Sequence, residues 1–321
     1  MDPHTSCGSL LATVGVGAFV GYNYCTKEAG EDTLYGCAND AVVNMYLTLW
    51  SNDDANQSDV SSKGTVETKT FYSQALDHTM QYAIYLPPGY YDLRHSFIRY
   101  PVVYLLPGAS GSIDTWVKAG DMAEQMDSLL TQGQVQPMIL VVPQESIEYY
   151  SNGGGVDGAL GNWETYTAQD LVNEIDSNYR TIHSKEGRMI AGDSEGGYSA
   201  MNLGLRNPSE FGVIGSFSGT FTIDKDDLSK IFGGDQSLAE ANSPMHYLPQ
   251  LKGALPAIYL LVGEQDSASL KETSEFAQEL KARNAPFKFD TFPGGHNWEF
   301  WRAHLPDLLI FAREHLSGGG G

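Results

Sequence analysis

Residues 190–200, Ile-Ala-Gly-Asp-Ser-Glu-Gly-Gly-Tyr-Ser-Ala, carry the strongest pattern in this sequence. An apolar run leads into the pattern G-x-S-x-G at Gly192 to Gly196, and a helix-compatible run follows. This is a nucleophile elbow in the context it requires, with a strand, a sharp turn and a helix. The glycines fit because such a turn brings two backbones so close that a Cβ would clash. We therefore expect Ser194 to be a nucleophile that needs a base and an orienting acid elsewhere in the chain.

Strand-like and helix-like runs alternate on both sides of this elbow. Apolar runs of strand length lie at residues 66–72, 80–86, 101–106, 138–142, 188–191, 213–216, 257–262 and 287–292. Helical patterns lie at residues 114–132, 165–179, 198–205, 268–283 and 298–314. The alternation predicts an α/β fold with a mostly parallel central sheet and helices on both faces. The first two strands are joined directly by a short turn, so we expect them to form an antiparallel edge.

Residues 1–62 differ in composition from the rest of the chain. Residues 9–24 are apolar and glycine-rich, whereas residues 51–63 are polar and typical of a linker or long loop. Residues 1–8 lack the Lys or Arg of a signal peptide, and the apolar run is short for a membrane span. We expect a strand-like or buried extension rather than a leader or an anchor. A small accessory domain, an addition to the sheet edge and a cap all stay open. The main domain is expected at 63–316, with a flexible glycine tail at 317–321.

The acidic charge of the chain limits its partners. Asp and Glu number 40 against 19 Lys and Arg, a formal net charge of −21. Such a charge repels nucleic acid and anionic membranes, so neither is expected as a partner.

All three cysteines precede residue 38. Cys25 and Cys37 can close a small loop, which leaves Cys7 without a partner in that pairing. A disulfide there favours a secreted or extracytoplasmic protein, with a cytoplasmic protein as the alternative.

The base is expected in the loop after the last predicted strand. In open α/β sheets ligands bind at the carboxyl ends of the strands, and chains with this elbow place the nucleophile, acid and base in that order. Pro293-Gly-Gly-His-Asn-Trp298 follows the strand at 287–292. The other histidines precede the first buried strand or lie in helical and irregular contexts. We expect His296 to be the base.

The acid is expected after the preceding strand, at 257–262. Gly263-Glu-Gln-Asp-Ser267 comes next and offers two carboxylates. Asp266 lies further into the loop, where it can turn back towards His296, whereas Glu264 is closer to the strand and can pair on the surface. We expect Asp266 to fix the imidazole tautomer and to stabilise the imidazolium.

Two backbone N–H groups are needed to bind an oxyanion. Glu195 follows the nucleophile at the N-terminus of a helix, where the helix dipole assists. The loop Pro107-Gly-Ala-Ser-Gly111 follows the strand at 101–106, and Ala109 is the expected second donor.

Four tryptophans lie in or near loops that should border this site. Trp298 is the best candidate for an aromatic wall, and Trp116 and Trp163 are further candidate substrate-binding residues. Packing of the final helix explains Trp301 at least as well as a place in the site.

Several longer motifs are similar to one known family. They are Tyr85-Leu-Pro-Pro-Gly89, Tyr100-Pro-Val-Val-Tyr-Leu-Leu-Pro-Gly108, Asp176-Ser-Asn-Tyr-Arg-Thr181, Ala191-Gly-Asp-Ser-Glu-Gly-Gly-Tyr198, Gly263-Glu-Gln-Asp266 and Gly294-Gly-His-Asn-Trp298. From about residue 64 to 316 the chain resembles the esterase D family of α/β-hydrolases. That family includes feruloyl and acetyl-xylan esterases, S-formylglutathione hydrolases, enterochelin esterases and mycolyltransferases of the antigen 85 group. The resemblance implies the α/β-hydrolase fold, with nucleophile, acid and base at Ser194, Asp266 and His296.

The chain departs from the family pattern at two positions. The family often has His-Gly where this chain has Pro107-Gly108, and often has Met where it has Glu195. Both changes leave the expected backbone donors in place. A Glu195 carboxylate that faces the pocket is expected to disfavour anionic substrates.

The sequence thus predicts a serine carboxylic ester hydrolase that works through an acyl-enzyme, without a metal or cofactor. Feruloyl or other carbohydrate-linked esters are the expected substrate class. Acyl transfer of the antigen 85 type is the alternative among enzymes, and a non-catalytic binding protein on the same fold is the alternative of another class.

Two weaker motifs are interpreted as loops without a binding site. Gly153-x-Gly155-x-x-Gly158 does not open a helix after a strand, as a dinucleotide site requires, and Asp224-Lys-Asp-Asp227 is typical of a solvated turn rather than a calcium site.

Overall fold

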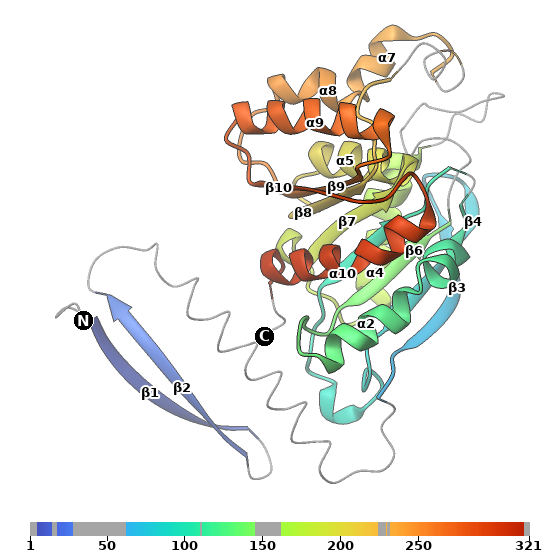
Figure 1. Ribbon diagram of the computed structural model, residues 1–321. Helices are drawn as coiled ribbons and strands as arrows, with labels where there is room; N and C mark the ends of the chain where they lie inside the picture. The colour runs from blue at the N-terminus through green and yellow to red at the C-terminus, as the bar shows by residue number, and fades with distance from the viewer. Residues whose placement is uncertain are drawn as a thin grey trace.

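An eight-stranded mixed sheet forms the centre of the computed structural model. The structure describes residues 62–109, 111–144, 162–223, 229 and 232–317, together with the backbone of 5–14 and 18–27. The strands of the sheet are β3 (Thr65–Ser73), β4 (His78–Leu86), β5 (Val102–Leu106), β6 (Ile139–Pro143), β7 (Arg188–Asp193), β8 (Val213–Phe217), β9 (Ala257–Gly263) and β10 (Phe287–Phe292). Their order is β10-β9-β8-β7-β5-β6-β4-β3 (Figure 1).

The pairing of the strands follows from how they are connected. The strands from β5 to β10 pair in parallel, because a helix or a long segment crosses over between them. β4 pairs antiparallel with both β3 and β6. The turn between β3 and β4 includes Asp77 at a φ of 51°, a left-handed conformation that Asp tolerates better than most residues. The predicted α/β fold with an antiparallel N-terminal edge is confirmed.

Helices cover both faces of the sheet. α2 (Met122–Thr131) and α10 (Trp298–His315) pack on one face, and α4 (Val172–Asn178), α5 (Glu195–Arg206) and α9 (Ser267–Ala282) pack on the other (Figure 1). Alternate residues of β5 supply the two cores, with Tyr104 facing one and Leu105 the other. Every residue of β5 is buried, as expected for a parallel strand covered on both faces. The remaining described helical segments are η1 (Leu93–His95), η2 (Thr115–Ala119), α3 (Trp163–Thr165), η4 (Tyr166–Leu171), η5 (Lys185–Gly187), α7 (Gln236–Ala241), α8 (Pro244–Tyr247) and η6 (Leu248–Gln250).

One predicted helix is interrupted. The pattern at 114–132 becomes the π-helical turn η2 followed by α2, with a break at Gly120 and Asp121. A Cβ on Gly120 would lie 2.7 Å from the carbonyl oxygen of Trp116, and Asp121 has a φ of 49°. Trp116, in the turn before the break, is completely buried. Side-chain periodicity continues across such a break, so it does not reveal the break.

The N-terminal extension contains a two-stranded antiparallel hairpin. β1 (Thr5–Val14) pairs with β2 (Ala18–Lys27), and Cys7 lies opposite Cys25 in the register. The expected strand-like segment is therefore present. Cys37 lies outside the described residues, so pairing of Cys25 with Cys37 stays a prediction, as do the domain boundaries. In the described part of the chain, no helix has the length and apolar character needed to cross a bilayer.

Candidate active site

Ser194 occupies a sharp turn between β7 and α5. Its φ of 52° and ψ of −117° lie outside the regions that side-chain-bearing residues normally occupy, which is a form of strain found at functional sites. Its N–H donates to the carbonyl of Phe217 at 2.8 Å. A Cβ on Gly196 would lie 2.2 Å from the carbonyl oxygen of Leu106. The missing side chain therefore lets α5 begin directly against β5 and fixes where the serine hydroxyl lies.

Ser194, His296 and Asp266 form one hydrogen-bonded chain. Nε2 of His296 is 2.8 Å from Oγ of Ser194, and its Nδ1 is 2.8 Å from Oδ2 of Asp266. The Asp266 side chain is 6% exposed and the His296 side chain is 42% exposed. The structure thus brings Asp266 to the imidazole, whereas Glu264 is exposed. The arrangement allows a proton to pass from the serine hydroxyl to an imidazole whose other nitrogen is held by a carboxylate.

Two loops that follow neighbouring strands bring the acid and the base together. Gly263 ends β9, and a Cβ there would lie 2.3 Å from the carbonyl oxygen of Gly294, after β10. Gln265 donates its N–H to Gly294 at 2.9 Å, and the Gly294 N–H donates to Oε1 of Gln265 at 2.6 Å. Gly294 has a φ of 147°, a conformation that favours glycine. The pair of glycines lets the two loops touch, and His296 follows two residues later.

The expected oxyanion donors lie on either side of Ser194. Glu195 is the first residue of α5, and N–H groups in the first turn of a helix point away from the helix towards its N-terminal end. The loop with Ala109 turns through a hydrogen bond from Gly111 N–H to the Gly108 carbonyl at 2.9 Å. A Cβ on Gly108 would lie 3.2 Å from the Cβ of Ser194, so this loop packs directly on the serine. Both expected donors thus belong to segments that adjoin the nucleophile, and their role as an oxyanion site stays a prediction.

Asp193 is an ionisable group that the sequence motif does not explain. It ends β7 directly before Ser194 and is 2% exposed. Burial raises the pKa of its carboxyl group to about 8, against an opposing effect of hydrogen bonds from the backbone of Gly108 and of Asp193 itself. Desolvation dominates because a buried carboxylate loses its hydration.

Comparison with known proteins identifies the family of this chain. The family model described as "Putative esterase" matches residues 73–312. The chain belongs to this family. The match covers the strands and loops that carry Ser194, Asp266 and His296, and it places this region among the esterases.

Named relatives and solved structures agree with the family. The chain is 29% identical over 237 residues to an esterase of Mycobacterium tuberculosis, covering 64% of this chain and 50% of that protein. It is 30% identical over 157 residues to an endo-1,4-beta-xylanase/feruloyl esterase of Xylanibacter ruminicola, covering 49% of this chain and 22% of that protein. The chain thus spans half or less of the length of these two relatives. A ferulic acid esterase structure superposes with a TM-score of 0.70 at 27% identity, covering 79% of this chain and 99% of that one. An S-formylglutathione hydrolase from Agrobacterium tumefaciens shares the fold, with a TM-score of 0.68 at 18% identity. The match covers 81% of this chain and 98% of that chain.

The candidate tryptophans of this esterase-family chain lie in three different settings. Trp298 is half-buried and packs edge-on against Trp116 at 5.0 Å. Trp116 is fully buried and donates its indole N–H to the carbonyl of Leu106 at 3.2 Å. It therefore supports Trp298 from below and offers no surface to a substrate in this structure. Trp163 packs against Tyr166 at 5.6 Å, and among the described contacts none joins it to Ser194, Asp266 or His296.

Of two further residues near the imidazole, the sequence analysis missed Ser269 and left Trp301 open between core packing and the site. The Ser269 N–H donates to Oδ1 of Asp266 at 3.4 Å, and its hydroxyl lies 3.4 Å from Nδ1 of His296. Trp301 packs edge-on against the imidazole at 5.0 Å. The sequence signal that could have revealed Ser269 is its spacing from Asp266. Ser269 lies three residues after Asp266, which caps α9, and N-cap side chains bind backbone donors at that distance.

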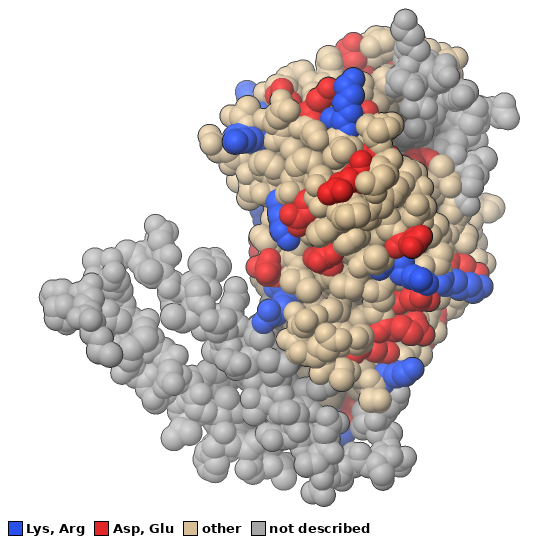
Figure 2. Space-filling view, viewed as in Figure 1, with Lys and Arg blue, Asp and Glu red and all other residues tan. Residues whose placement is uncertain are grey.

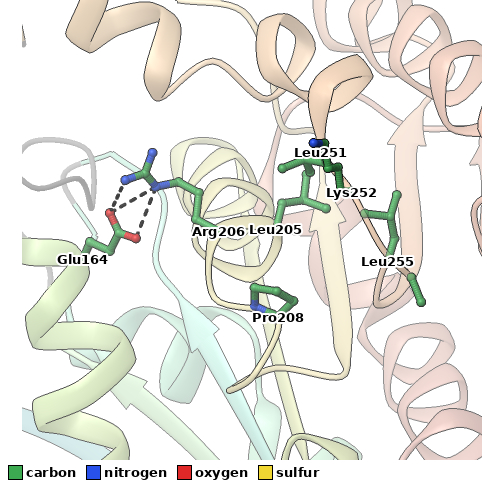
Figure 3. A pocket seen from close by; sticks show the side chains of 8 residues that line it. Glu164, Leu205, Arg206, Pro208, Leu251, Lys252 and Leu255 are labelled. Atoms are coloured by element: carbon green, nitrogen blue, oxygen red, sulfur yellow. Dashed lines mark hydrogen bonds and ion pairs between the residues drawn. The ribbon is translucent and has the colours of Figure 1, made fainter.

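A cavity of about 380 Å³ lies at the opposite end of α5 from Ser194 (Figure 3). The Arg206 guanidinium closes one side through hydrogen bonds of 3.0 to 3.2 Å to the Glu164 carboxylate. Its other lining residues are Leu205, Pro208, Leu251, Lys252, Ala254 and Leu255. This cavity contains none of the three hydrogen-bonded residues, so it is separate from the candidate active site.

Several expectations concern residues outside the described part. They include the loop at 149–161 and the acidic turn at Asp224 to Asp227.

Within the described ranges, no group of three or more His, Cys, Asp and Glu side chains is arranged to hold a metal. On the face shown in Figure 2, acidic and basic side chains are interspersed over the described surface.

Proposed function

We propose that residues 63–316 hydrolyse carboxylic esters through a covalent acyl-enzyme on Ser194. The observation that carries this proposal is the hydrogen-bonded chain from the Ser194 hydroxyl through His296 to Asp266, with both distances at 2.8 Å. Membership of the esterase family supports the same reaction class. A serine hydroxyl becomes a useful nucleophile only beside a base that is itself oriented.

The reaction proceeds in two balanced halves. In the first, Oγ of Ser194 bonds to the ester carbonyl carbon while its proton moves to Nε2 of His296. The N–H groups of Ala109 and Glu195 stabilise the oxyanion. The bond to the alcohol oxygen then breaks, and the alcohol leaves with the proton from Nε2. In the second half, water gives a proton to Nε2 and attacks the acyl carbon, and the carboxylic acid is released as Ser194 recovers its proton.

The exposure of His296 favours water over a second alcohol as the acyl acceptor. Its side chain is 42% exposed, and acyl transfer depends on keeping water away from the acyl-enzyme. Hydrolysis is therefore the preferred second half-reaction for this chain.

Feruloyl or other carbohydrate-linked esters are the proposed substrates. Support comes from the names of a relative and a solved structure, the xylanase/feruloyl esterase and the ferulic acid esterase. Trp298 supplies an aromatic surface two residues after His296. Planar aromatic acyl groups gain from such a surface through offset or edge-to-face packing.

A trapping experiment tests the mechanism. The protein is mixed with p-nitrophenyl acetate, and both the burst of p-nitrophenol and the mass of the quenched protein are measured. We expect a burst and the added mass of one acetyl group on Ser194, both absent in Ser194→Ala. Ser199→Ala is the matched control, because Ser199 lies on the same helix and its buried hydroxyl has no partner among the described residues. Binding without turnover by the unmodified chain would instead indicate a non-catalytic binding protein.

A second experiment tests the substrate class. Methyl ferulate, acetylated xylan, a short-chain p-nitrophenyl ester and a thioester are compared by kcat/KM, with ethanol added in a parallel series. We expect methyl ferulate to be preferred by about tenfold or more, the size of one good apolar contact. A preference for another ester would overturn the substrate class and leave the mechanism standing. Ethyl ester formation in place of acid would overturn hydrolysis as the second half-reaction.

A further inference from the structure

The carboxyl group of Asp193 lies next to the nucleophile but takes no part in the proposed proton transfer. Asp193 is 2% exposed, and its Oδ1 accepts no hydrogen bond from the described residues. Its backbone lies opposite Phe217 in the sheet. A buried carboxylate with an unpartnered oxygen is costly, because the lost hydration is not replaced. A carboxyl group in this position is therefore either uncharged or a charged group that is retained for a function.

The other carboxyl oxygen of Asp193 faces the loop that carries the expected oxyanion donor. The Gly108 N–H donates to the Asp193 carboxyl group, and a Cβ on Gly108 would lie 2.6 Å from Oδ2. The carbonyl of Gly108 accepts the hydrogen bond that turns the loop around Ala109. The carboxyl group therefore holds one side of this loop, while Ser194 lies against the same glycine.

The surroundings of Asp193 favour the uncharged form. No Lys, Arg or His among the described residues lowers its pKa by charge, and burial raises that pKa to about 8. The loop after β5 contributes Gly108, and β8 contributes Phe217, neither of which titrates. The titratable groups of the neighbouring site are Glu195, His296 and Asp266, and none of them is among the groups that shift the pKa of Asp193. At neutral pH the acid form is therefore the major one.

We propose that Asp193 is a positioning residue, which holds the Gly108–Ala109 loop as a neutral carboxylic acid and whose ionisation disables the oxyanion site. This inference rests on the proposed ester hydrolysis and deepens it. A negative charge beside Ser194 opposes the charge that develops on the tetrahedral intermediate, in surroundings where charges are poorly screened. The ground-state ester is uncharged, so ionisation lowers kcat and changes KM little.

The test compares pH profiles of kcat and KM for p-nitrophenyl acetate, followed at the isosbestic wavelength of p-nitrophenol. In the unmodified protein we expect kcat to fall at alkaline pH with the pKa of Asp193, about 8. Asp193→Asn keeps the shape and the acceptor for Gly108 but cannot ionise, so it retains kcat within about threefold at neutral pH and loses the alkaline fall. Asp193→Leu fills the space without an acceptor and lowers kcat by about tenfold or more at every pH, with KM within about threefold.

Asp127→Asn is the matched control. Asp127 lies on α2 and accepts hydrogen bonds from Gly64 N–H at 2.9 Å and the Tyr85 hydroxyl at 2.6 Å, so it is a structural carboxylate away from Ser194. Its variant keeps the alkaline fall. A plateau in the unmodified protein, or an alkaline fall that persists in Asp193→Asn, overturns the proposal.

Infrared spectroscopy separates this inference from the proposed function. A carbonyl band of a protonated carboxylic acid, present at neutral pH and missing in Asp193→Asn, reports the neutral acid without any turnover. Its absence overturns the inference even when ester hydrolysis is normal. If Ser194→Ala still hydrolyses esters, the proposed function fails, and the band still decides the state of Asp193.

Discussion

The indole ring of Trp301 packs edge-on against the imidazole of His296, with ring centroids 5.0 Å apart and planes at 83°. Trp301 is 5% exposed and its Nε1 donates to the Ser218 hydroxyl at 3.3 Å. Ser218 follows β8 and has a φ of 52°. The base is therefore held by Asp266 on one side and by a ring that is itself anchored to the next strand end.

Replacing Trp301 is expected to lower kcat more than replacing its neighbours on α10. Trp301→Phe keeps a ring beside His296 and loses one hydrogen bond, at a cost of about 1 kcal/mol of stability. Trp301→Ala removes the ring, costs about 3 to 5 kcal/mol of stability, and lowers kcat by about 100-fold because the imidazole is no longer fixed. Urea denaturation and steady-state kinetics measure the two effects.

Phe311→Ala is the control for this prediction. Phe311 is 4% exposed on the same helix and packs on Tyr259 at 4.9 Å, far along α10 from His296. It should lose comparable stability while the folded fraction keeps its kcat. An equal loss of kcat in both variants would show that Trp301 acts only through stability.

The two carboxylates after β9 are expected to differ sharply in their effect on catalysis. Asp266→Asn leaves the shape of the loop but favours the wrong imidazole tautomer, so kcat should fall by about four orders of magnitude. Glu264→Gln, two residues earlier and exposed, should change kcat by less than about twofold. Single-turnover kinetics with a p-nitrophenyl ester would measure both. Loss of activity in Glu264→Gln alone would transfer the role of the acid to Glu264.

The sequence was sufficient to predict the eight strands of the sheet, the longer helices between them and the residues that meet at the site. Strand ends in a parallel sheet share one edge, so Ser194, Asp266 and His296 could be inferred from their places after β7, β9 and β10. Contacts that depend on packing were less predictable. Trp116 was expected at the surface of the site, but it is completely buried and packs against Phe217 and Trp298. The contact of Trp301 with His296 depends on the rotation of α10, which helical periodicity does not specify.

Gly196 in the elbow and Gly295 in the loop after β10 are expected to tolerate substitution very differently. Gly196→Ala places a Cβ 2.2 Å from the carbonyl oxygen of Leu106, and backbone atoms on both sides cannot move apart cheaply. Gly295→Ala meets only the Asn297 amide nitrogen, at 3.4 Å. The first variant should lose about 3 kcal/mol or more of unfolding free energy or fail to fold, and the second should lose less than about 1 kcal/mol. Chemical denaturation followed by tryptophan fluorescence measures both, and similar losses would contradict the close contact between α5 and β5.

Asp193→Asn is expected to raise thermal stability by an amount that grows with pH. The folded-state pKa of Asp193 is raised from 3.8 to about 8, so folding favours the protonated carboxyl group. Its contribution to stability is fully present below about pH 4 and is lost progressively as the pH rises to about 8, beyond which it is constant. Asparagine has no charged form, so the gain in Tm over the unmodified protein should be small near pH 4, increase up to about pH 8 and then level off. Asp127→Asn, which removes a hydrogen-bonded carboxylate, should show no such gain. A Tm difference for Asp193→Asn that does not vary with pH would mean that the folded and unfolded chains bind this proton equally.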